Sequence, residues 1–325
     1  MRKLLESYLN LKWYSQSNAL YFLKPLSWLY IFLSNAKYIK PAEKLETPII
    51  VIGNINAGGM GKTPLAIWLA QKFKKSGLKV AVVLKPYRVR KFLGYHFISI
   101  DDNPSLYGDE PCMIKNKTEV DVVVTFNRFR TIAQIKHEFD IILLDDGLQD
   151  INTARSFNIC VTDYMKKFGN KCLLPVGPLR NSIESLINVD EICVRGKSVS
   201  IPAYTLEIDG FYRLNDPNKK LMAKLPKAHY IAVSGMAHPE KFHDSLRGHL
   251  KSFETLSYSD HHHWKPVDFF QIHNESIVVT EKDAVKLNFE ISVDVYVANT
   301  IIVPNDHLQT LYTKLLKLIS IDDKV

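Results

Sequence analysis

Residues 54–64 read Asn54-Ile55-Asn56-Ala57-Gly58-Gly59-Met60-Gly61-Lys62-Thr63-Pro64. This segment follows an apolar run at 49–52 and precedes a helical pattern at 65–70. The order predicts a buried strand, a glycine-rich loop and a helix. In such a loop the glycines let backbone N–H groups converge on phosphate oxygens, and the helix N-terminus adds positive partial charge. The segment therefore indicates a phosphate-binding loop.

The residues expected to bind nucleotide are Asn56, Ala57, Gly58, Gly59, Met60, Gly61, Lys62 and Thr63. Lys62 would reach the terminal phosphates of ATP, and Thr63 would hold Mg²⁺. The strict P-loop pattern has a glycine five positions before Gly61, where this chain has Asn56. A glycine-rich turn can also be purely structural, and the loop alone does not separate these two interpretations.

A second buried strand ends in paired carboxylates. Residues 139–144, which are apolar except for Asp140, run directly into Asp145 and Asp146. Acidic residues at strand ends are common turn formers. In a nucleotide site, however, an acidic residue at such a position holds the metal. We therefore expect Asp145 and Asp146 to bind Mg²⁺ together with Thr63.

The order of strands and helices predicts an α/β fold. Apolar runs at 80–84, 122–124 and 159–161 alternate with helical segments such as 130–135, which indicates a P-loop NTPase-type parallel sheet with helices on both faces. Strand patterns at 191–194 and 203–208 lack an intervening long helix. We expect these two segments to form a two-stranded connector.

A smaller C-terminal α/β domain is expected to follow the connector. Its pattern begins with an apolar run at 229–235, returns to a strand at 276–280 and ends in a helix after Pro304. That helix should carry Leu308, Leu311, Leu315 and Ile319 on one face. The expected parts are an N-terminal segment at 1–46, a P-loop core at 47–190, the connector at 191–212 and the C-terminal domain at 213–325.

The N-terminal segment contains a short run rich in aromatic residues at 26–33, flanked by Lys24 and by Lys37, Lys40 and Lys44. It is too short for a spanning helix, which needs about 20 apolar residues. Leucine and aromatic side chains beside lysines fit a helix that lies in a membrane interface. A helix packed on the protein's own core is the alternative. No cleavable signal sequence is indicated, so we expect the protein to stay in the cytoplasm.

Seven motifs in series resemble those of one enzyme family, the tetraacyldisaccharide 4'-kinases. The resemblance covers nearly the whole chain. The motifs are Val51-Ile52-Gly53-Asn54, Gly58-Gly59-Met60-Gly61-Lys62-Thr63-Pro64, Gly108-Asp109-Glu110-Pro111, Asp145-Asp146-Gly147-Leu148-Gln149, Leu174-Pro175-Val176-Gly177-Pro178-Leu179-Arg180, Asp260-His261-His262 and Thr280-Glu281-Lys282-Asp283-Ala284.

The resemblance implies phosphoryl transfer from ATP, with Mg²⁺, to the 4'-hydroxyl of a tetraacyldisaccharide 1-phosphate in lipid A biosynthesis. It implies that Asp109 is the catalytic base, assisted by His261 across a cleft between two domains, and that Lys62 is also catalytic. From the residues alone, Asp109 could instead cap a helix and His261 could belong to a polar loop. The implied partners are the anionic acylated disaccharide and the inner-membrane lipid surface, which the protein would bind peripherally on its cytoplasmic face as a monotopic protein.

Three positions depart from the family pattern. Asp150 stands where a histidine usually follows the glutamine, Asn181 stands where a glutamate usually follows the arginine, and Lys85-Pro86-Tyr87 replaces a common Arg-Gly-Tyr turn. The departures leave the residues expected to carry the chemistry unchanged. The resemblance therefore says least about the individual contacts that residues near these positions make with substrate or metal.

Two other functions share features with this sequence. A membrane-associated nucleotide-switch ATPase of the partitioning or septum-placing type shares the Gly-Gly-x-Gly-Lys-Thr core but carries a signature lysine where this chain has Ala57. The formal net charge of +8 could suggest nucleic acid, but lysines and arginines are dispersed among acids and no nucleic-acid-binding motif is present. We expect no nucleic-acid partner, and no obligate protein partner is evident.

Overall fold

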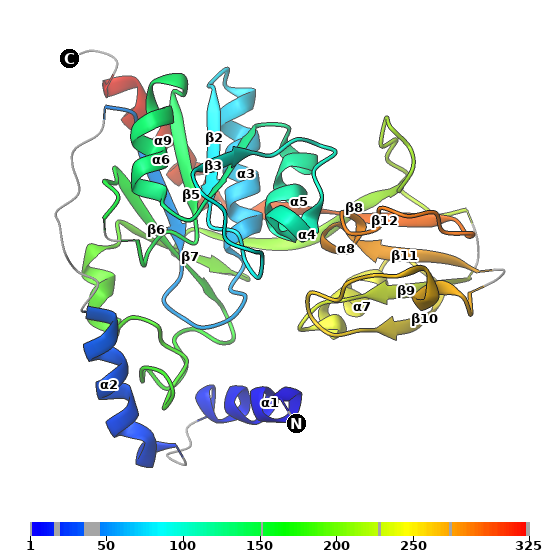
Figure 1. Ribbon diagram of the computed structural model, residues 1–325, viewed down its shortest axis with the longest axis horizontal. Coiled ribbons are helices and arrows are strands. Elements are labelled where there is room, and N and C mark those ends of the chain that lie inside the picture. Colours follow the sequence, from blue (N-terminus) through cyan, green and yellow to red (C-terminus); the bar gives the residue numbers. More distant parts are fainter. Residues whose placement is uncertain are drawn as a thin grey trace.

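The computed structural model describes residues 2–15, 20–35, 46–150, 152–226, 229–272 and 275–322. In these residues one sheet of twelve strands runs through both halves of the molecule, in the order β10-β9-β11-β12-β8-β7-β6-β1-β5-β2-β4-β3 (Figure 1). The strands are β1 (Ile49–Gly53), β2 (Val80–Leu84), β3 (Tyr95–Phe97), β4 (Asp121–Thr125), β5 (Ile141–Asp145), β6 (Phe157–Asp163), β7 (Glu191–Arg195), β8 (Ala203–Arg213), β9 (His229–Ser234), β10 (Ser252–Ser257), β11 (Ser276–Thr280) and β12 (Val295–Pro304).

Helices cover both faces of the sheet, as expected. The α-helices are α1 (Arg2–Trp13), α2 (Lys24–Asn35), α3 (Lys62–Lys75), α4 (Pro104–Tyr107), α5 (Asp109–Thr118), α6 (Arg128–Ile135), α7 (Pro239–Leu246), α8 (Glu281–Ala284) and α9 (Asp306–Asp322). Short 3₁₀ segments are η1 (Tyr21–Leu23), η2 (Lys136–Glu138), η3 (Ile183–Asn188) and η4 (Pro266–Phe269).

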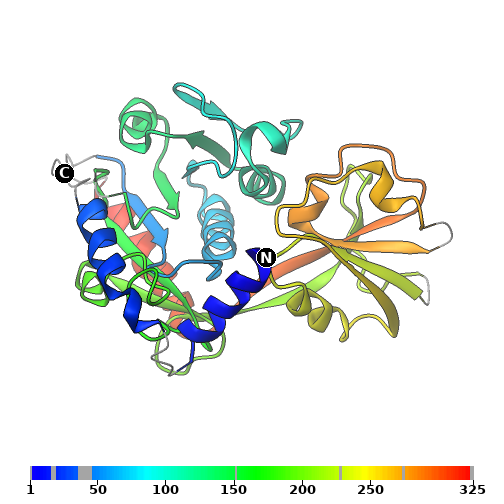
Figure 2. The same ribbon diagram turned by 60° about the horizontal axis from the view of Figure 1, so that its bottom comes forward.

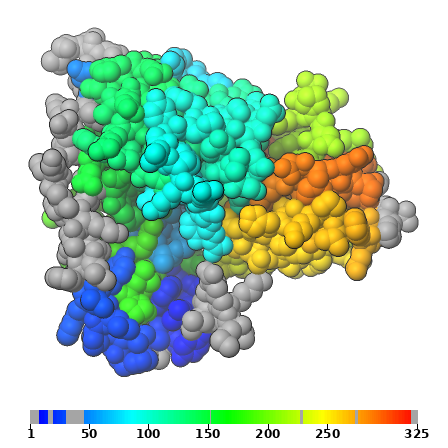
Figure 3. All heavy atoms as spheres, viewed as in Figure 1, coloured from blue at the N-terminus to red at the C-terminus, as the bar shows by residue number. Residues whose placement is uncertain are grey.

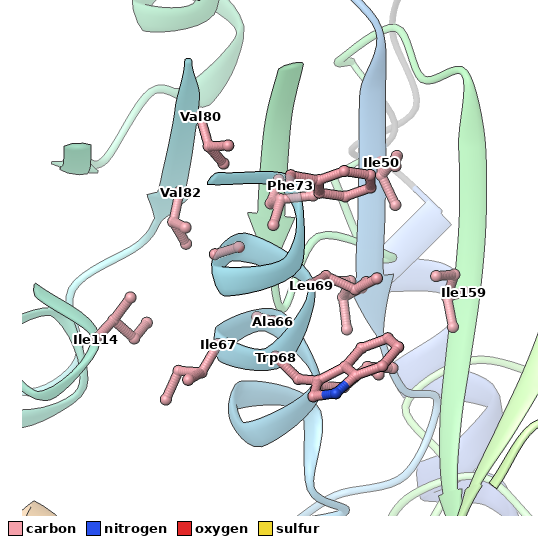
Figure 4. Packing of buried hydrophobic residues seen from close by; sticks show 14 of the residues in the cluster. Ile50, Ala66, Ile67, Trp68, Leu69, Phe73, Val80, Val82, Ile114 and Ile159 are labelled. Atoms are coloured by element: carbon pink, nitrogen blue, oxygen red, sulfur yellow. The ribbon is translucent and has the colours of Figure 1, made fainter. Parts of the chain in front are cut away.

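Strand β1 is buried along its whole length between two helical layers. Ile50 and Ile52 belong to the cluster that contains the apolar face of α3, whereas Ile49 and Val51 belong to the cluster that contains α6. Successive strand residues point to opposite faces, so a strand covered on both sides reads as a continuous apolar run. Figure 4 shows Leu69 and Phe73 of α3 beside β1.

The last helix returns to the first half of the molecule. Leu308, Leu311, Leu315 and Ile319 are buried in the same cluster as α3, which confirms the predicted apolar face. The Tyr312 hydroxyl donates to the carbonyl of Lys72 at 3.1 Å. The predicted C-terminal domain at 213–325 included this helix, whereas in the structure α9 packs on α3. We therefore use "core lobe" for residues 46–202 and 305–322, and "second lobe" for 214–294.

The pair of strands that links the two lobes is β8 and β12. They pair antiparallel from Tyr204 opposite Pro304 to Arg213 opposite Tyr296, with an irregularity at Asn299/Thr300. Strand β7 pairs in parallel with β6 over five positions and with β8 over only two. We predicted that 191–194 and 203–208 would together form the connector. In the structure β8 does belong to the connector, but its main partner there is β12 instead of β7. The partner of β8 comes from 295–304, about 90 residues later, which local periodicity cannot indicate.

Helices α1 and α2 lie along one side of the core lobe, away from the far end of the second lobe (Figures 2 and 3). They are attached to a loop at 172–180, which we call the proline loop. The Trp13 indole N–H donates to the Pro175 carbonyl, the Ser27 hydroxyl to Leu173 and the Tyr30 hydroxyl to Arg180. The lysines at 37, 40 and 44 that flank the predicted interfacial run lie outside the described residues.

Substitution of Leu69 by alanine is expected to lower the free energy of unfolding by about 2–5 kcal/mol, because it removes a fully buried side chain between α3 and the sheet. Urea denaturation measures the difference. Leu93→Ala is the matched control, since Leu93 is fully exposed and its truncation should change the free energy by less than about 0.5 kcal/mol. Equal effects of the two substitutions would contradict the assigned core.

Candidate active site

The glycine loop joins β1 to α3 and is shaped by two glycines with positive φ. Gly58 has φ 97° and Gly61 has φ 98°, a region that favours glycine. A Cβ at Gly61 would lie 2.6 Å from the Tyr204 hydroxyl, so this position also has no room for a side chain. A Cβ at Gly58 or Gly59 would meet nothing within 4 Å, so this part of the loop is open.

The first two residues of the predicted nucleotide loop, Asn56 and Ala57, form hydrogen bonds with other parts of the protein. Asn56 is fully buried, and its side-chain amide donates to the Lys167 carbonyl at 3.0 Å. The Ala57 N–H donates to the Pro178 carbonyl at 2.6 Å, and the Met60 side chain is buried. Asn56 thus replaces the usual glycine with an anchored amide. These contacts fix the start of the loop, whereas the loop is open at Gly58 and Gly59.

Lys62, in the first turn of α3, points back over the loop. Its Nζ donates to Asn54 Oδ1 at 3.1 Å and lies 3.3 Å from Asp146 Oδ1. Arg180 at the end of the proline loop binds the same carboxylate, with Nη2 at 2.9 Å from Oδ1. Two cations therefore converge on one acidic side chain beside the open glycines.

Asp145 and Asp146 lie at the end of β5 in opposite electrostatic states. Burial raises the pKa of Asp145 from 3.8 to about 7, with Glu110 and Asp146 adding to the effect. Burial also disfavours ionised Asp146, but Lys62 and Arg180 outweigh it and hold the pKa of Asp146 well below its usual range. Asp145 is thus held in a site that disfavours its charge unless a further cation is present.

The hydrogen bonding of the Asp145 carboxylate is compatible with a magnesium ion held by Asp145 and Thr63. The Thr63 hydroxyl donates to Asp145 Oδ2 at 2.9 Å, while Asp145 Oδ1 is buried and has no hydrogen-bond partner among the described residues. Mg²⁺ in kinases takes few protein ligands and keeps phosphate and water oxygens. The absence of three clustered His, Cys, Asp or Glu side chains in the described part of the chain is compatible with such a site. Asp146 is already engaged by two cations, so the geometry favours Asp145 as the ligand.

Asp109 and His261 come from different lobes and meet, as the resemblance implied. Asp109 begins α5 in the core lobe, and its Oδ2 lies 3.0 Å from His261 Nδ1. His261 has φ 58°, an uncommon conformation for a non-glycine residue. Burial alone would raise the pKa of Asp109, but the hydrogen bond from His261 and the charge of Lys286 lower it below its ordinary value. Asp109 is therefore held as a carboxylate.

The neighbouring histidines have other partners. His262 Nε2 lies 2.9 Å from Asp268 Oδ2, whereas His263 is exposed. Consecutive histidines thus point to different surroundings. Of the positions that depart from the family pattern, Asn181 accepts from the Gln149 amide at 2.9 Å, and Asp150 Oδ2 lies 4.0 Å from Arg128 Nη1.

Sequence reasoning missed one cation at the site. Arg128 is buried at the start of α6 and donates to the backbone carbonyls of Asp145 and Asp146. It therefore fixes the turn that carries both carboxylates. Arg180 was recognised only as part of a motif. No local pattern marks Arg128, because its partners lie 17 and 18 residues away.

The charge state of Asp145 gives a prediction for stability. In metal-free and nucleotide-free buffer, Asp145→Asn is expected to raise the free energy of unfolding at pH 8. The folded-state pKa of about 7 exceeds the ordinary 3.8, so the folded protein binds more protons between these values and loses stability as pH rises through them. Urea denaturation from pH 4 to pH 8 should show the advantage of the variant shrinking toward pH 4.

Asp146→Asn is the matched control with the opposite sign. In the wild type, Lys62 and Arg180 lower the folded-state pKa of the Asp146 carboxyl. The contribution of this carboxylate to the free energy of unfolding is therefore present at neutral pH and is lost as pH falls below the ordinary pKa of an aspartate. The variant should be less stable than the wild type at pH 8. The same direction of change in both variants would overturn the contrast between the two carboxylates.

Comparisons with known proteins agree with the motifs. A family model described as tetraacyldisaccharide-1-P 4'-kinase, LpxK, matches residues 19–318. The tetraacyldisaccharide 4'-kinase of Legionella pneumophila (strain Corby) is 35% identical over 288 residues, covering 86% of this chain and 88% of the relative. That of Hamiltonella defensa is 34% identical over 287 residues, covering 84% and 87%.

The fold also has a solved counterpart. A crystal structure of LpxK from Aquifex aeolicus in complex with ATP superposes with a TM-score of 0.73 at 22% identity, covering 92% of this chain and 99% of that chain. At this identity the likeness supports the fold.

Proposed function

The chain belongs to the tetraacyldisaccharide-1-phosphate 4'-kinase family. On this premise we propose that phosphoryl transfer from ATP, with Mg²⁺, takes place in the space between Lys62 and the Asp109–His261 pair. The protein is a kinase of lipid A biosynthesis whose acceptor is the 4'-hydroxyl of the disaccharide. The nucleotide-switch ATPase considered from the sequence is not supported by these relatives.

One observation supports the site assignment above all others. A carboxylate and an imidazole from two lobes lie 3.0 Å apart at the first turn of α5. The next residue, Glu110, is near enough to Asp145 to contribute to its raised pKa. The candidate base is therefore positioned beside the residues proposed to hold the phosphates and the metal.

The proposed reaction uses Asp109 as the base. The Asp109 carboxylate binds His261 through Oδ2, which leaves Oδ1 for the acceptor hydroxyl. As the 4'-oxygen bonds to the γ-phosphorus, its proton passes to Asp109, and ADP leaves with the electrons of the broken P–O bond. Lys62 offsets negative charge on the transferring group. Bound to Asp145 and Thr63, Mg²⁺ would supply further charge neutralisation at the phosphates.

The assay that tests the proposal incubates the protein with labelled ATP, detergent and the tetraacyldisaccharide 1-phosphate. Asp109→Ala and His261→Ala are each expected to lower kcat by roughly 10²–10⁴ with little change in ATP affinity. The double variant should be scarcely slower than the slower single variant, because groups that act as one unit are strongly non-additive.

His263→Ala is the control, since His263 neighbours His261 but is exposed. It should retain normal turnover. Fully multiplicative losses in the double variant, or normal kcat for His261→Ala, would show that Asp109 works without His261.

The N-terminal helices support a peripheral position on a membrane. Among the described residues no helix combines the length and apolar composition needed to cross a bilayer. Yet Phe22 is 75% exposed, Trp28 is 69% exposed, and Leu26 and Leu29 are about half exposed. Ser27 and Tyr30 on the other side of the helix bind the proline loop. We assign this exposed side to the lipid surface of the inner membrane, on its cytoplasmic face.

Replacement of Phe22 and Trp28 by serine is expected to release the protein from vesicles that contain anionic lipid. It should lower activity on dispersed lipid substrate more than it lowers basal ATP hydrolysis, because neither side chain is buried in the fold. Vesicle sedimentation measures the binding. Phe270→Ser is the matched control, because Phe270 is 65% exposed but belongs to the second lobe. Unchanged sedimentation of the double variant would refute the assignment.

A further inference from the structure

Helix α8 lies where the second lobe meets the core lobe. Its first residue, Glu281, forms an ion pair with Lys117 at the end of α5, and both side chains are largely buried. Lys117 also binds the carbonyl of Thr300 in β12. The short helix is therefore fixed against both α5 and the linking strand, and the position of the next residue, Lys282, is fixed with it.

Lys282 lies on the opposite side of His261 from the proposed base. Its Nζ is 3.4 Å from His261 Nε2 and donates to Asp260 Oδ1 at 3.2 Å. On the other side of the ring, His261 Nδ1 faces Asp109 at 3.0 Å. The imidazole thus lies between a lysine ammonium group and a carboxylate.

The donors and acceptors at the two ring nitrogens select one tautomer. A lysine ammonium group has three donors and no acceptor, so Nε2 can bond to Lys282 only through its lone pair. The carboxylate of Asp109 accepts only, so Nδ1 must carry the proton. Both contacts are satisfied together only in neutral imidazole protonated at Nδ1.

We propose that Lys282 is a positioning residue that holds His261 in the Nδ1–H tautomer, so that His261 donates to Asp109 and leaves this carboxylate able to accept the substrate proton. This inference rests on the proposed role of Asp109 as the base. The contact with Lys282 extends the catalytic pair to three residues, of which only Asp109 touches the acceptor.

The other groups around the ring show what Lys282 opposes. Asp260 Oδ2 lies 3.7 Å from Nε2 and would attract a proton to that nitrogen. The Tyr87 ring is tilted against the imidazole with ring centroids 5.3 Å apart, and Lys286, which follows the C-terminal end of α8, lowers the pKa of Asp109. Without Lys282, a proton on Nε2 would face Asp260. The neutral Nε2–H tautomer would then direct an unprotonated Nδ1 at the Asp109 carboxylate.

The test combines ¹⁵N spectra of histidine-labelled protein with kinetics. In the wild-type protein at pH 8, long-range ¹H–¹⁵N correlations should show His261 protonated at Nδ1 and unprotonated at Nε2. In Lys282→Met this pattern should be replaced by protonation at Nε2 or at both nitrogens. The kcat should fall roughly 10- to 10³-fold, below the loss caused by removing the orienting carboxylate of a serine-protease triad, while the KM for ATP stays unchanged.

Two further variants separate this role from simple stabilisation. Lys282→Arg keeps a charged donor and should retain the Nδ1–H pattern and most of the kcat. Lys251→Met removes an exposed lysine of the same lobe and should alter neither. A wild-type spectrum with His261 protonated at Nε2 would overturn the proposal without any variant, and so would an unchanged spectrum in a folded Lys282→Met protein.

The assignment of Asp109 as the base is tested by a separate measurement, the turnover of the Asp109→Ala variant. Normal turnover by Asp109→Ala would remove the base from the mechanism, whereas the tautomer spectrum of the wild-type protein still decides whether Lys282 sets the protonation of His261.

Discussion

The contact between Asp109 and His261, the proposed catalytic pair, depends on the antiparallel pairing of β8 with β12. Asp109 belongs to the core lobe and His261 to the second lobe; β8 carries the chain from the core lobe to the second lobe, and β12 carries it back. Because both strands belong to one sheet with the rest of each lobe, they hold the two lobes in register. Backbone pairing thus determines the lobe positions at which Asp109 can contact His261. An ion pair between Lys117, near the C-terminal end of α5, and Glu281 of α8 adds a second contact between the lobes.

Local patterns in the sequence were sufficient for the core strands and for the glycine loop. The continuous apolar runs of β1 and β5 reflect burial on both faces, which is a local signal. The partner of β8 and the return of α9 to the core lobe could not be predicted in this way, because both depend on contacts between segments far apart in the chain. The meeting of Asp109 with His261 was available only from the resemblance, since 152 residues separate them.

The assignment of residues 56–63 as one nucleotide-binding stretch stays a prediction. In the structure the Asn56 side-chain amide and the Ala57 N–H are bonded to other parts of the protein. A one-dimensional motif records which residues occur, but it does not record which backbone groups are already satisfied. Arg128 illustrates the converse, because it fixes the acidic turn through backbone carbonyls that carry no sequence signature.

The two adjacent carboxylates show how one turn supports two electrostatic roles. Asp146 is compensated by Lys62 and Arg180, whereas Asp145 keeps one buried oxygen without a partner. Neighbouring groups whose pKa values are pushed apart commonly divide a task between them. Here Asp146 binds Lys62 and Arg180, and Asp145 is the carboxylate that we propose as the ligand of a metal cation.

The proline loop connects the proposed membrane contact to the phosphate site. On one side it receives hydrogen bonds from Trp13, Ser27 and Tyr30. On the other side its Pro178 carbonyl accepts from Ala57, and its Arg180 side chain binds Asp146. Helix α2 and the glycine loop are therefore fixed to the same short segment. With α2 on a lipid surface, the site would stand at a constant height above it, which suits an acceptor whose acyl chains remain in the membrane while its sugar hydroxyl reaches Asp109.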